Sequence, residues 1–467
     1  MENGNGNEYP IRKSRSMGTT ESSWCAAVDS GTGTSISGIL LGQSIDPAPL
    51  RAAISTILSS QPLLRSWITE KEGQLRFDVD ASTLLDVEVV DKAERAEEED
   101  PDRTQEPWLQ IVEDEMDAGF PKEKPFRVFQ VKLYRLPDAN SLIILRFHTG
   151  AADFASAVRV CSELMKHLKE CLELNGEGSD QKVPNLEEEE DDIFELQVPS
   201  LEAATPPAKA KKSFWAHGID VLGYGLASFR HALLPLENVV DERQSRVIVA
   251  EFKEDATRLI LELCKQKSSD LNGLLDAAAL KAVAKFKGTG KRGEHYAVVI
   301  LLNCRSMLEP AIPDSTSGFY NAAIMKTIHA TETVPLWELA TRITKDFDQA
   351  VKNNKHFTDM GDLNMLMTQA ITRPAVTPSS SMRTAFLSNA RDACREEVDK
   401  GLLSSLSVKD WITCTSLNGI GPCLALYPVL RNGCLRVSFV YCNPLFSTET
   451  IKCLVDDISS MLNDLDK

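Results

Sequence analysis

The chain has 467 residues, of which 43% are hydrophobic and 25% are charged, a composition typical of a soluble globular protein. Its formal net charge of −17 argues against nucleic acid or an anionic membrane as the main partner. The length exceeds what one hydrophobic core supports and predicts two domains of roughly 200 residues each.

Apolar runs are short along the whole chain. The run YAVVILL (296–302) is among the longest and is far shorter than a bilayer span. The N-terminus is polar and glycine-rich and has no apolar signal region, so we expect residues 1–30 to be disordered and the protein to be cytoplasmic. The acidic runs at 94–102 and 186–192 are typical of solvated loops.

The eleven cysteines have mostly apolar neighbours and form no CxxC pair. We therefore expect buried, reduced thiols. No metal site is expected, because no cysteines cluster at ligand spacing. The sequence also has no signature of a permanently bound cofactor.

Hydrophobic periodicity in the first half predicts a strand, a helix leading into a strand, a hairpin and a long helix, at residues 33–41, 45–68, 127–136 with 141–148, and from 153 onwards. Asp46 and Pro47 have the residue types of a helix N-cap and first helical position. Residues 176–240 are first acidic and then rich in proline and lysine. They are interpreted as a linker, exposed over 175–212, with one helix near 213–233.

The second half repeats this order of elements. It predicts a strand, two helices, a buried strand, a helix, a hairpin and a last helix, at residues 244–252, 255–266, 271–287, 295–308, 335–353, 423–442 and 447–465. Asn432-Gly433 is the strongest short signal for a hairpin turn. We therefore predict an α/β protein with two similar lobes, 31–175 and 241–467, each a mixed β-sheet flanked by helices.

The segment LRFHTGAADF (145–154) gives the first functional signal. An apolar strand ends at His148, and after a short turn Asp153 begins a strongly amphipathic helix. A histidine between a strand and a helix is well placed to act as a general base, because the pKa of imidazole lies near neutral pH.

Several segments, in chain order, resemble one family. DPAPLRAAISTILSSQPLLRSWI resembles the opening helix and strand of the acyltransferase superfamily that includes chloramphenicol acetyltransferase, peptide-synthetase condensation domains and plant BAHD acyltransferases. HTGAAD stands where that superfamily carries HHxxxDG, and NGIGP (418–422) where condensation-like members carry a loop ending in Gly-Pro. Further matches are LNGLLDAAALKAVAKF, LLNCRSMLEP, GFYNA and LRVSFVYCNPLFSTETIKCLVDDI. The whole pattern, over residues 33–465, is most similar to plant condensation-like proteins.

The resemblance implies two lobes that meet at a tunnel, an acyl donor that is usually a coenzyme A thioester, and a small alcohol, phenol or amine as acceptor. The family's base is the second histidine of HHxxxDG, which takes the acceptor's proton as that atom attacks the thioester carbonyl. The family's aspartate pairs with an arginine, and here these two residues correspond to Asp153 and Arg305. The same resemblance places six residues in the tunnel or its loops: Gly150, Asn303, Tyr320, Asn321, Gly421 and Pro422.

Two registers of HTGAAD on this motif remain open. Without a gap, His148 aligns with the first histidine and Thr149 with the base. With one extra residue in the turn, His148 itself is the base. Side chains alternate along a strand, so Thr149 should share a face with Leu145 and Phe147, with His148 on the other face. We prefer the ungapped register because Asp153 then keeps its family position, although a threonine cannot act as a base at neutral pH.

Three functions stay open, because Thr149 stands at the base position. The first is acyl transfer from coenzyme A, by a monomeric plant enzyme of specialised metabolism, with positioning supplying much of the rate. The second is the same fold repurposed for elimination, cyclisation or hydrolysis. The third is a non-catalytic protein that binds small molecules. The other histidines are interpreted as structural, although His217 and His231 lie in the crossover segment, which can line the tunnel in this fold.

Overall fold

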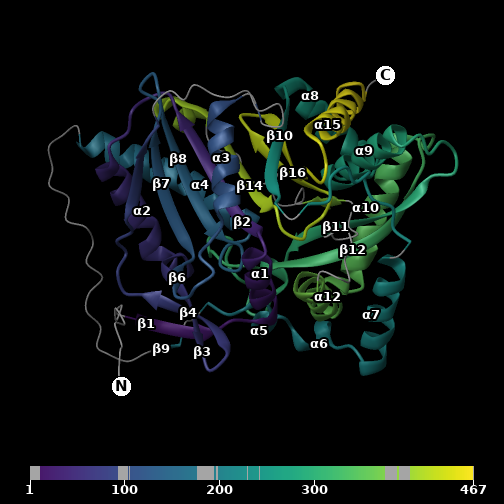
Figure 1. Cartoon of the computed structure of the whole chain (residues 1–467), viewed down its shortest axis with the longest axis horizontal. Helices are drawn as coiled ribbons and strands as arrows, with labels where there is room; N and C mark the ends of the chain where they lie inside the picture. The colour runs from purple at the N-terminus through teal and green to yellow at the C-terminus, as the bar shows by residue number, and fades with distance from the viewer. Residues whose placement is uncertain are drawn as a thin grey trace.

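The computed structural model describes the following residues: 11–92, 104, 106–175, 194–195, 198–228, 230–240, 242–373, 386–388 and 400–465. Figure 1 shows two lobes side by side, with the first half of the chain on the left and most of the second half on the right. Each lobe has its own hydrophobic cluster of buried side chains. The predicted two-lobed α/β architecture is confirmed.

The first lobe is built on a five-stranded sheet and a smaller five-stranded sheet below it in Figure 1. The larger sheet has the order β14 (Val408–Leu417), β2 (Thr32–Leu41), β8 (Ser141–His148), β7 (Phe129–Arg135) and β5 (Val87–Asp91). The smaller sheet has the order β6 (Phe126–Arg127), β3 (Ser66–Lys71), β4 (Gln74–Asp80), β1 (Ile11–Ser16) and β9 (Phe194–Glu195). The helices of this half are α1 (Thr19–Asp29), α2 (Pro47–Ser60), α3 (Pro107–Ala118) and α4 (Phe154–Asn175).

The second lobe contains a mixed six-stranded sheet. Its order is β10 (Gln244–Phe252), β16 (Cys434–Asn443), β15 (Leu424–Arg431), β13 (Phe386–Ser388), β11 (Glu294–Asn303) and β12 (Asn321–Ala330). The helices of the second half are α8 (Glu254–Gln266), α9 (Leu271–Phe286), α10 (Leu336–Lys352), α11 (Lys355–Thr358), α12 (Met360–Thr372), α14 (Lys400–Ser405) and α15 (Thr448–Asn463). The crossover between the lobes carries α5 (Leu201–Ala204), α6 (Pro207–Ala210) and α7 (Phe214–Ser228).

Local sequence explains most of these elements. All eight residues of β8 are buried, as expected for a continuous apolar run in the middle of a sheet. The hairpin of β15 and β16 turns at Asn432 and Gly433, whose φ angles of 52° and 78° suit these two residue types. Asp46 is the N-cap of α2 and Pro47 its first residue, as predicted, although the Asp46 side chain makes no capping hydrogen bond.

The predicted disorder of residues 1–30 is wrong from Ile11 onwards. Residues 11–16 form β1 and residues 19–29 form α1, while residues 1–10 lie outside the described part. Two charged residues of this segment are buried and paired rather than solvated: Arg15 donates to Glu21 at 2.6 and 2.7 Å. Glu21 also accepts the backbone N–H of Gly18 at the start of α1, at 2.8 Å. These bonds satisfy the side chains of Arg15 and Glu21 and the Gly18 N–H within the protein, whereas the polar composition of the segment suggested that water would do so.

Residues 175–212 were predicted to form an exposed linker, and this prediction is wrong for the part from Leu201 to Ala210. Residues 176–193 lie outside the described residues, but the chain is helical again at α5 and α6. Leu201 and Ala204 belong to the core of the second lobe. Apolar burial therefore orders this part of the crossover.

The two halves are also joined through a sheet. β14, from the second half, pairs antiparallel with β2 and forms an edge of the larger first-lobe sheet. The segment 241–467 therefore does not fold as a separate lobe around its own sheet alone.

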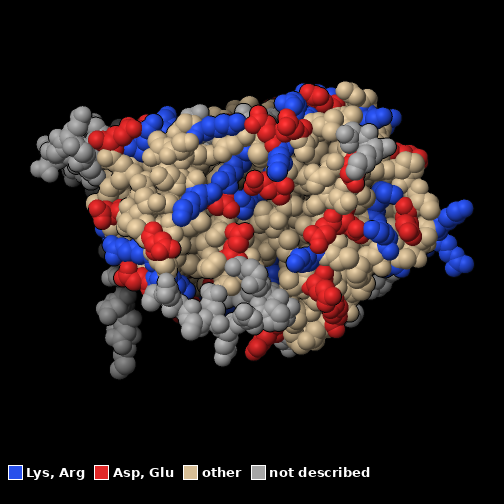
Figure 2. Space-filling view, turned by 90° about the horizontal axis from the view of Figure 1, so that it is seen from above, with Lys and Arg blue, Asp and Glu red and all other residues tan. Residues whose placement is uncertain are grey.

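Other global expectations concern thiols, membranes and charge. The cysteines in the described residues are free, and most of them are buried. None of the helices in the described residues is both long and apolar enough to span a bilayer. On the face seen in Figure 2, basic and acidic side chains are interspersed rather than gathered by sign.

Candidate functional site

A cavity of about 340 Å³ lies where the two halves of the chain meet. First-half walls come from α1, β2 and the turn after β8. Second-half walls come from β11, β12, α12, β14 and β15, and α7 of the crossover adds Tyr224 and Gly225. The surface is largely apolar, with aromatic contributions from Trp24, Phe154 and Phe319. A concave, mostly apolar pocket between lobes is a typical small-molecule site.

A row of hydroxyl groups crosses one wall of this cavity. Ser35 on β2 is paired in register with Thr415 on β14, and their side-chain oxygens are 2.8 Å apart. The Ser35 hydroxyl also lies 3.3 Å from that of Thr149. The phenol of Tyr427 also lines this cavity. Burial raises the pKa of that phenol, so it remains protonated at neutral pH.

Thr149 lines the cavity, whereas His148 does not lie among its lining residues. The Thr149 hydroxyl donates its proton to the backbone carbonyl of Gly33, in a short hydrogen bond. A hydroxyl has one proton to donate, so the oxygen presents lone pairs toward Ser35 and the cavity. This residue can accept or relay a hydrogen bond but cannot act as a base at neutral pH.

His148 lies on the opposite face of β8 and is fully buried. Its ring packs against Phe120 and Phe126, with ring centroids 5.3 and 5.9 Å away. Nδ1 accepts the backbone N–H of Gly150 at 3.1 Å, which leaves the proton of the neutral ring on Nε2. Burial, with a smaller contribution from the charge of Lys124, lowers the pKa of His148 to about 3. The imidazole is therefore a neutral packing group behind the cavity wall.

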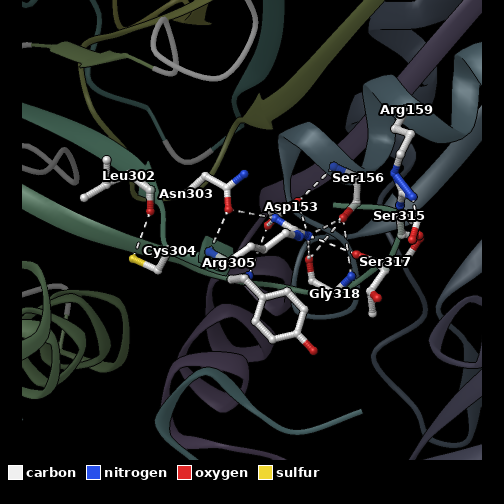
Figure 3. A network of polar contacts seen from close by, with 12 residues as sticks. Asp153, Ser156, Arg159, Leu302, Asn303, Cys304, Arg305, Ser315, Ser317 and Gly318 are labelled. Carbon is white, nitrogen blue, oxygen red and sulfur yellow. Dashed lines mark hydrogen bonds and ion pairs between the residues drawn. The ribbon is translucent and has the colours of Figure 1, made fainter. Parts of the chain in front are cut away.

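Asp153 and Arg305 form a buried ion pair between the two halves (Figure 3). Nη1 of Arg305 lies 2.8 Å from one carboxylate oxygen of Asp153, and Nη2 lies 3.1 Å from the other. Both side chains are almost completely buried, at 2% and 0% exposure. The parallel two-bond geometry is the strongest form that an arginine–carboxylate pair takes.

The surrounding groups complete the hydrogen bonding of this pair. Asp153 accepts the backbone N–H groups of Tyr320 at 3.0 Å and Ser156 at 2.9 Å. Arg305 donates to the Ser156 hydroxyl at 2.9 Å and to the Gly318 carbonyl at 3.1 Å (Figure 3). Burial alone would raise the pKa of Asp153, but the charge and hydrogen bonds of Arg305 outweigh it and hold the pKa below its usual value.

The six residues assigned to the tunnel or its loops separate into two groups. Asn321, Gly421 and Pro422 line the cavity with Thr149. The other three are Gly150, Asn303 and Tyr320, and they support the neighbouring structure instead. The side-chain oxygen of Asn303 accepts from the guanidinium of Arg305 at 3.2 Å, and the Tyr320 ring lies under that guanidinium, 4.9 Å from its carbon. Gly150 lies in the tight turn next to the His148 ring.

The cavity wall carries no charged side chain in the part of the chain that the structure describes. The titratable side chains among its lining residues are Tyr224, His231 and Tyr427. Burial raises the pKa of the Tyr224 phenol, which also donates to Asp359. His231 provides an imidazole at the wall, with Nε2 located 2.8 Å from the Thr327 hydroxyl. The chamber is thus neutral and hydroxyl-lined.

Sequence reasoning missed several lining residues. Thr20 and Trp24 lie on α1, in the segment that was expected to be disordered. The apolar Trp24, Cys25 and Val28, following Gly18 and Glu21, carry a helix signal that the polar N-terminus obscured. The α12 wall has residues such as Met360 and Leu366, which look like ordinary core in sequence.

One acidic cluster outside the cavity has the spacing of cation ligands: Asp220, Asp359 and Asp362. The ammonium group of Lys212 already lies between them, at 2.7, 2.9 and 2.6 Å from their carboxylates. The ammonium group of Lys355 also lies 3.2 Å from Asp220 and 3.3 Å from Asp359. Two lysines therefore balance most of the negative charge, and the cluster is an ionic anchor between the crossover and α11–α12.

Comparison with known proteins shows the fold. No protein-family model matches the chain, and no curated protein matches it. A trichothecene 15-O-acetyltransferase from Fusarium sporotrichioides superposes with a TM-score of 0.68 at 11% identity, covering 96% of this chain and 94% of that one. The first condensation domain of the calcium-dependent antibiotic synthetase gives 0.65 at 12% identity, with 97% and 96% covered. Polyketide synthase associated protein 5 from Mycobacterium tuberculosis gives 0.66 at 12% identity, with 97% and 98% covered.

These similarities extend over nearly the full length of both chains. The protein therefore has the two-lobed fold that an acetyltransferase and a condensation domain share, as the sequence resemblance implied.

Proposed function

We propose that this protein binds a neutral, largely apolar small molecule in the cavity between its lobes, and that it does so without a base at the HHxxxDG position. The observation that carries the proposal is the wall itself, in which the described lining residues include no Asp, Glu, Lys or Arg. A charged ligand would lose its hydration there without gaining an ionic partner. A neutral ligand with one or two polar atoms loses far less hydration free energy when it enters the cavity.

The size and chemistry of the cavity support this proposal. Its volume of about 340 Å³ suits a small molecule. Trp24, Phe154 and Phe319 offer apolar contact area, and burial is worth about 25 cal/mol for each Å² removed from water. The hydroxyls of Ser35, Thr149 and the neighbouring Thr415 can orient a polar group of the ligand.

Isothermal titration with matched ligands tests this proposal. Decanol and methyl decanoate should bind, whereas decanoate, with the same chain and a negative charge, should bind at least 10-fold more weakly. Ala323→Trp, which adds a large ring at the cavity wall, should abolish binding. Ala208→Trp, on the exposed side of α6, is the matched control and should bind like the wild type. Equal binding of decanol and decanoate would contradict the proposal.

A second candidate is acyl transfer from a coenzyme A thioester to a small alcohol, phenol or amine. The observation that favours it is the intact Asp153–Arg305 pair beside the position of the base, together with the imidazole of His231 at the cavity wall. No described lining residue is cationic, so the phosphates of coenzyme A would lie outside the cavity. A role of this second candidate in plant specialised metabolism rests on the sequence resemblance alone.

Titration with coenzyme A, acetyl-coenzyme A and a longer acyl thioester separates the candidates. Binding followed by turnover supports acyl transfer, and binding without turnover supports the binding protein. If the protein binds decanol but none of the thioesters, it is either a binding protein for neutral ligands or an enzyme for a reaction other than acyl transfer. Thr149→His should create acyl transfer if the site still accepts a thioester, because it puts imidazole at the base position. In the wild type, His231→Ala should abolish transfer only if that imidazole is the base.

A further inference from the structure

Helix α7 carries a stripe of exposed apolar side chains. The fractional exposures are 79% for Trp215, 68% for Ile219, 62% for Leu222 and 58% for Leu226. Their spacings of four, three and four residues place them on one face of the helix. This α7 stripe contains half of the large hydrophobic residues that are strongly exposed in the described chain.

The opposite face of α7 is polar and points into the protein. His217 approaches Asp362 at 2.8 Å, Tyr224 donates to Asp359 at 2.5 Å, and Asp220 pairs with Lys212 at 2.7 Å. An ordinary surface helix turns its apolar face toward the core. Here the ionic anchor on α11–α12 fixes the helix the other way round, so the stripe cannot turn inward without breaking three polar contacts.

The dimensions of the stripe limit what can cover it. Four exposed side chains of one helix present on the order of 400 Å², about half of the ~800 Å² per partner that a stable protein interface buries. In Figure 1, α7 stands at the outer edge of the second lobe. A single protruding helix suits the interface of a lipid bilayer, which adapts its shape to the apolar face.

The charges next to the stripe agree with such a surface. Residues 211–230 contain four side chains that are charged at neutral pH, and two of them, Lys212 and Asp220, pair inside the anchor. The other two, Lys211 and Arg230, are both exposed and both cationic, one at each end of the helix. Cationic side chains at the ends of an apolar stripe complement lipid phosphates.

We propose that α7 docks the protein on a lipid bilayer surface, with the α7 stripe in the interfacial region and Lys211 and Arg230 at the level of the phosphates. This inference stands on the exposed helix face and does not depend on the proposed ligand. Where that ligand is bound, the location of α7 adds a consequence, because Tyr224 and Gly225 of the same helix line the cavity. Docking would then bring the apolar cavity next to an apolar phase.

Flotation with phosphatidylcholine vesicles tests the proposal. A neutral lipid is the appropriate probe because the net charge of −17 would oppose an anionic surface. The wild type should float with the vesicles. The combined variant Ile219→Ser, Leu222→Ser, Leu226→Ser should lose at least 10-fold in partitioning. Leu84→Ser, which removes a comparably exposed leucine (63%) in the first lobe, is the matched control and should float like the wild type.

Three results would overturn the proposal: a wild type that stays in solution, a combined variant that floats equally well, or wild-type dimers in solution that the combined variant abolishes. Melting curves will show whether the variant is folded, and the changed side chains are exposed, so the melting temperature should hardly change. Should it unfold, the single change Leu222→Ser gives the same comparison with a smaller expected loss. Trp215 adds an independent readout, since its emission should shift to the blue on vesicles and the shift should vanish in Trp215→Phe.

Discussion

The two halves of the chain meet in two adjacent regions of opposite character. At the Asp153–Arg305 junction, two full charges are buried and hydrogen-bonded on nearly every side. In the neighbouring cavity, the described wall is neutral, and its polar side chains are hydroxyls, the amides of Asn321, Asn364 and Gln369, and one imidazole. The junction can hold the lobes together whatever chemistry the cavity performs. Asp153, which joins the lobes, and position 149, where the family's base would lie, therefore belong to the same motif but can change independently of each other.

The largest effect should come from breaking the junction. Asp153→Asn should lower the free energy of unfolding by about 3–5 kcal/mol, because the guanidinium of Arg305 would remain buried without its charge partner. Urea denaturation measures the change. Arg258→Met, in the exposed pair with Asp255, is the matched control and should cost less than ~1 kcal/mol. If Asp153→Asn is as stable as the wild type, the junction is not what holds the lobes together.

A pH titration of stability sharpens the contrast between the two faces of β8. The pKa of His148 is about 3 in the folded protein, against about 6.5 when the chain is unfolded. Between these values the unfolded chain binds a proton that the folded one does not, so stability falls as the pH decreases from 6.5 toward 3. The slope from this residue is at most about 1.4 kcal/mol per pH unit.

His148→Asn keeps an acceptor for the Gly150 N–H and removes this titration. Its stability should therefore decrease less steeply than that of the wild type when urea denaturation is repeated at pH 7, 6, 5 and 4. Identical slopes would mean that the folded protein protonates this imidazole readily, and that His148 is not sealed behind the cavity wall.

The smallest effect is expected in the cavity. Thr415→Val removes one hydroxyl from the wall and should cost about 1 kcal/mol of stability while changing the affinity for decanol. Thr413→Val is a close control, because Thr413 pairs with Ser37 at 2.7 Å on the same two strands but does not line the cavity. It should lose similar stability without any change in binding. If both variants changed the affinity for decanol equally, the effect of Thr415→Val could not be assigned to a contact between its hydroxyl and the ligand.

Much of this arrangement could be predicted from local sequence. Periodicity identifies the strand and helix around His148, and strand alternation alone indicates that Thr149 and His148 point in opposite directions. Burial of Asp153 with Arg305 required the family resemblance, because 152 residues separate the partners.

The remainder depends on contacts between distant segments. The polar residues near the N-terminus are ordered because Glu202, far along the chain, accepts the backbone N–H of Thr20 at 2.6 Å. The neutrality of the cavity emerges only when walls from both halves are assembled. The stripe on α7 has the same pattern in sequence as a helix facing a core, and the polar contacts of His217, Asp220 and Tyr224 decide which side faces outward.

The position of β14 has a consequence for how the molecule is made. Its pairing with β2 joins Thr415 to Ser35, so the first-lobe sheet is completed only after nearly nine-tenths of the chain has been synthesised. Until then β2 is an edge with unsatisfied N–H and C=O groups, which is a template for pairing with other chains. Contacts of such long sequence separation slow folding. Expressed alone, residues 1–240 should therefore aggregate, and the two lobes cannot be exchanged between relatives as simple modules.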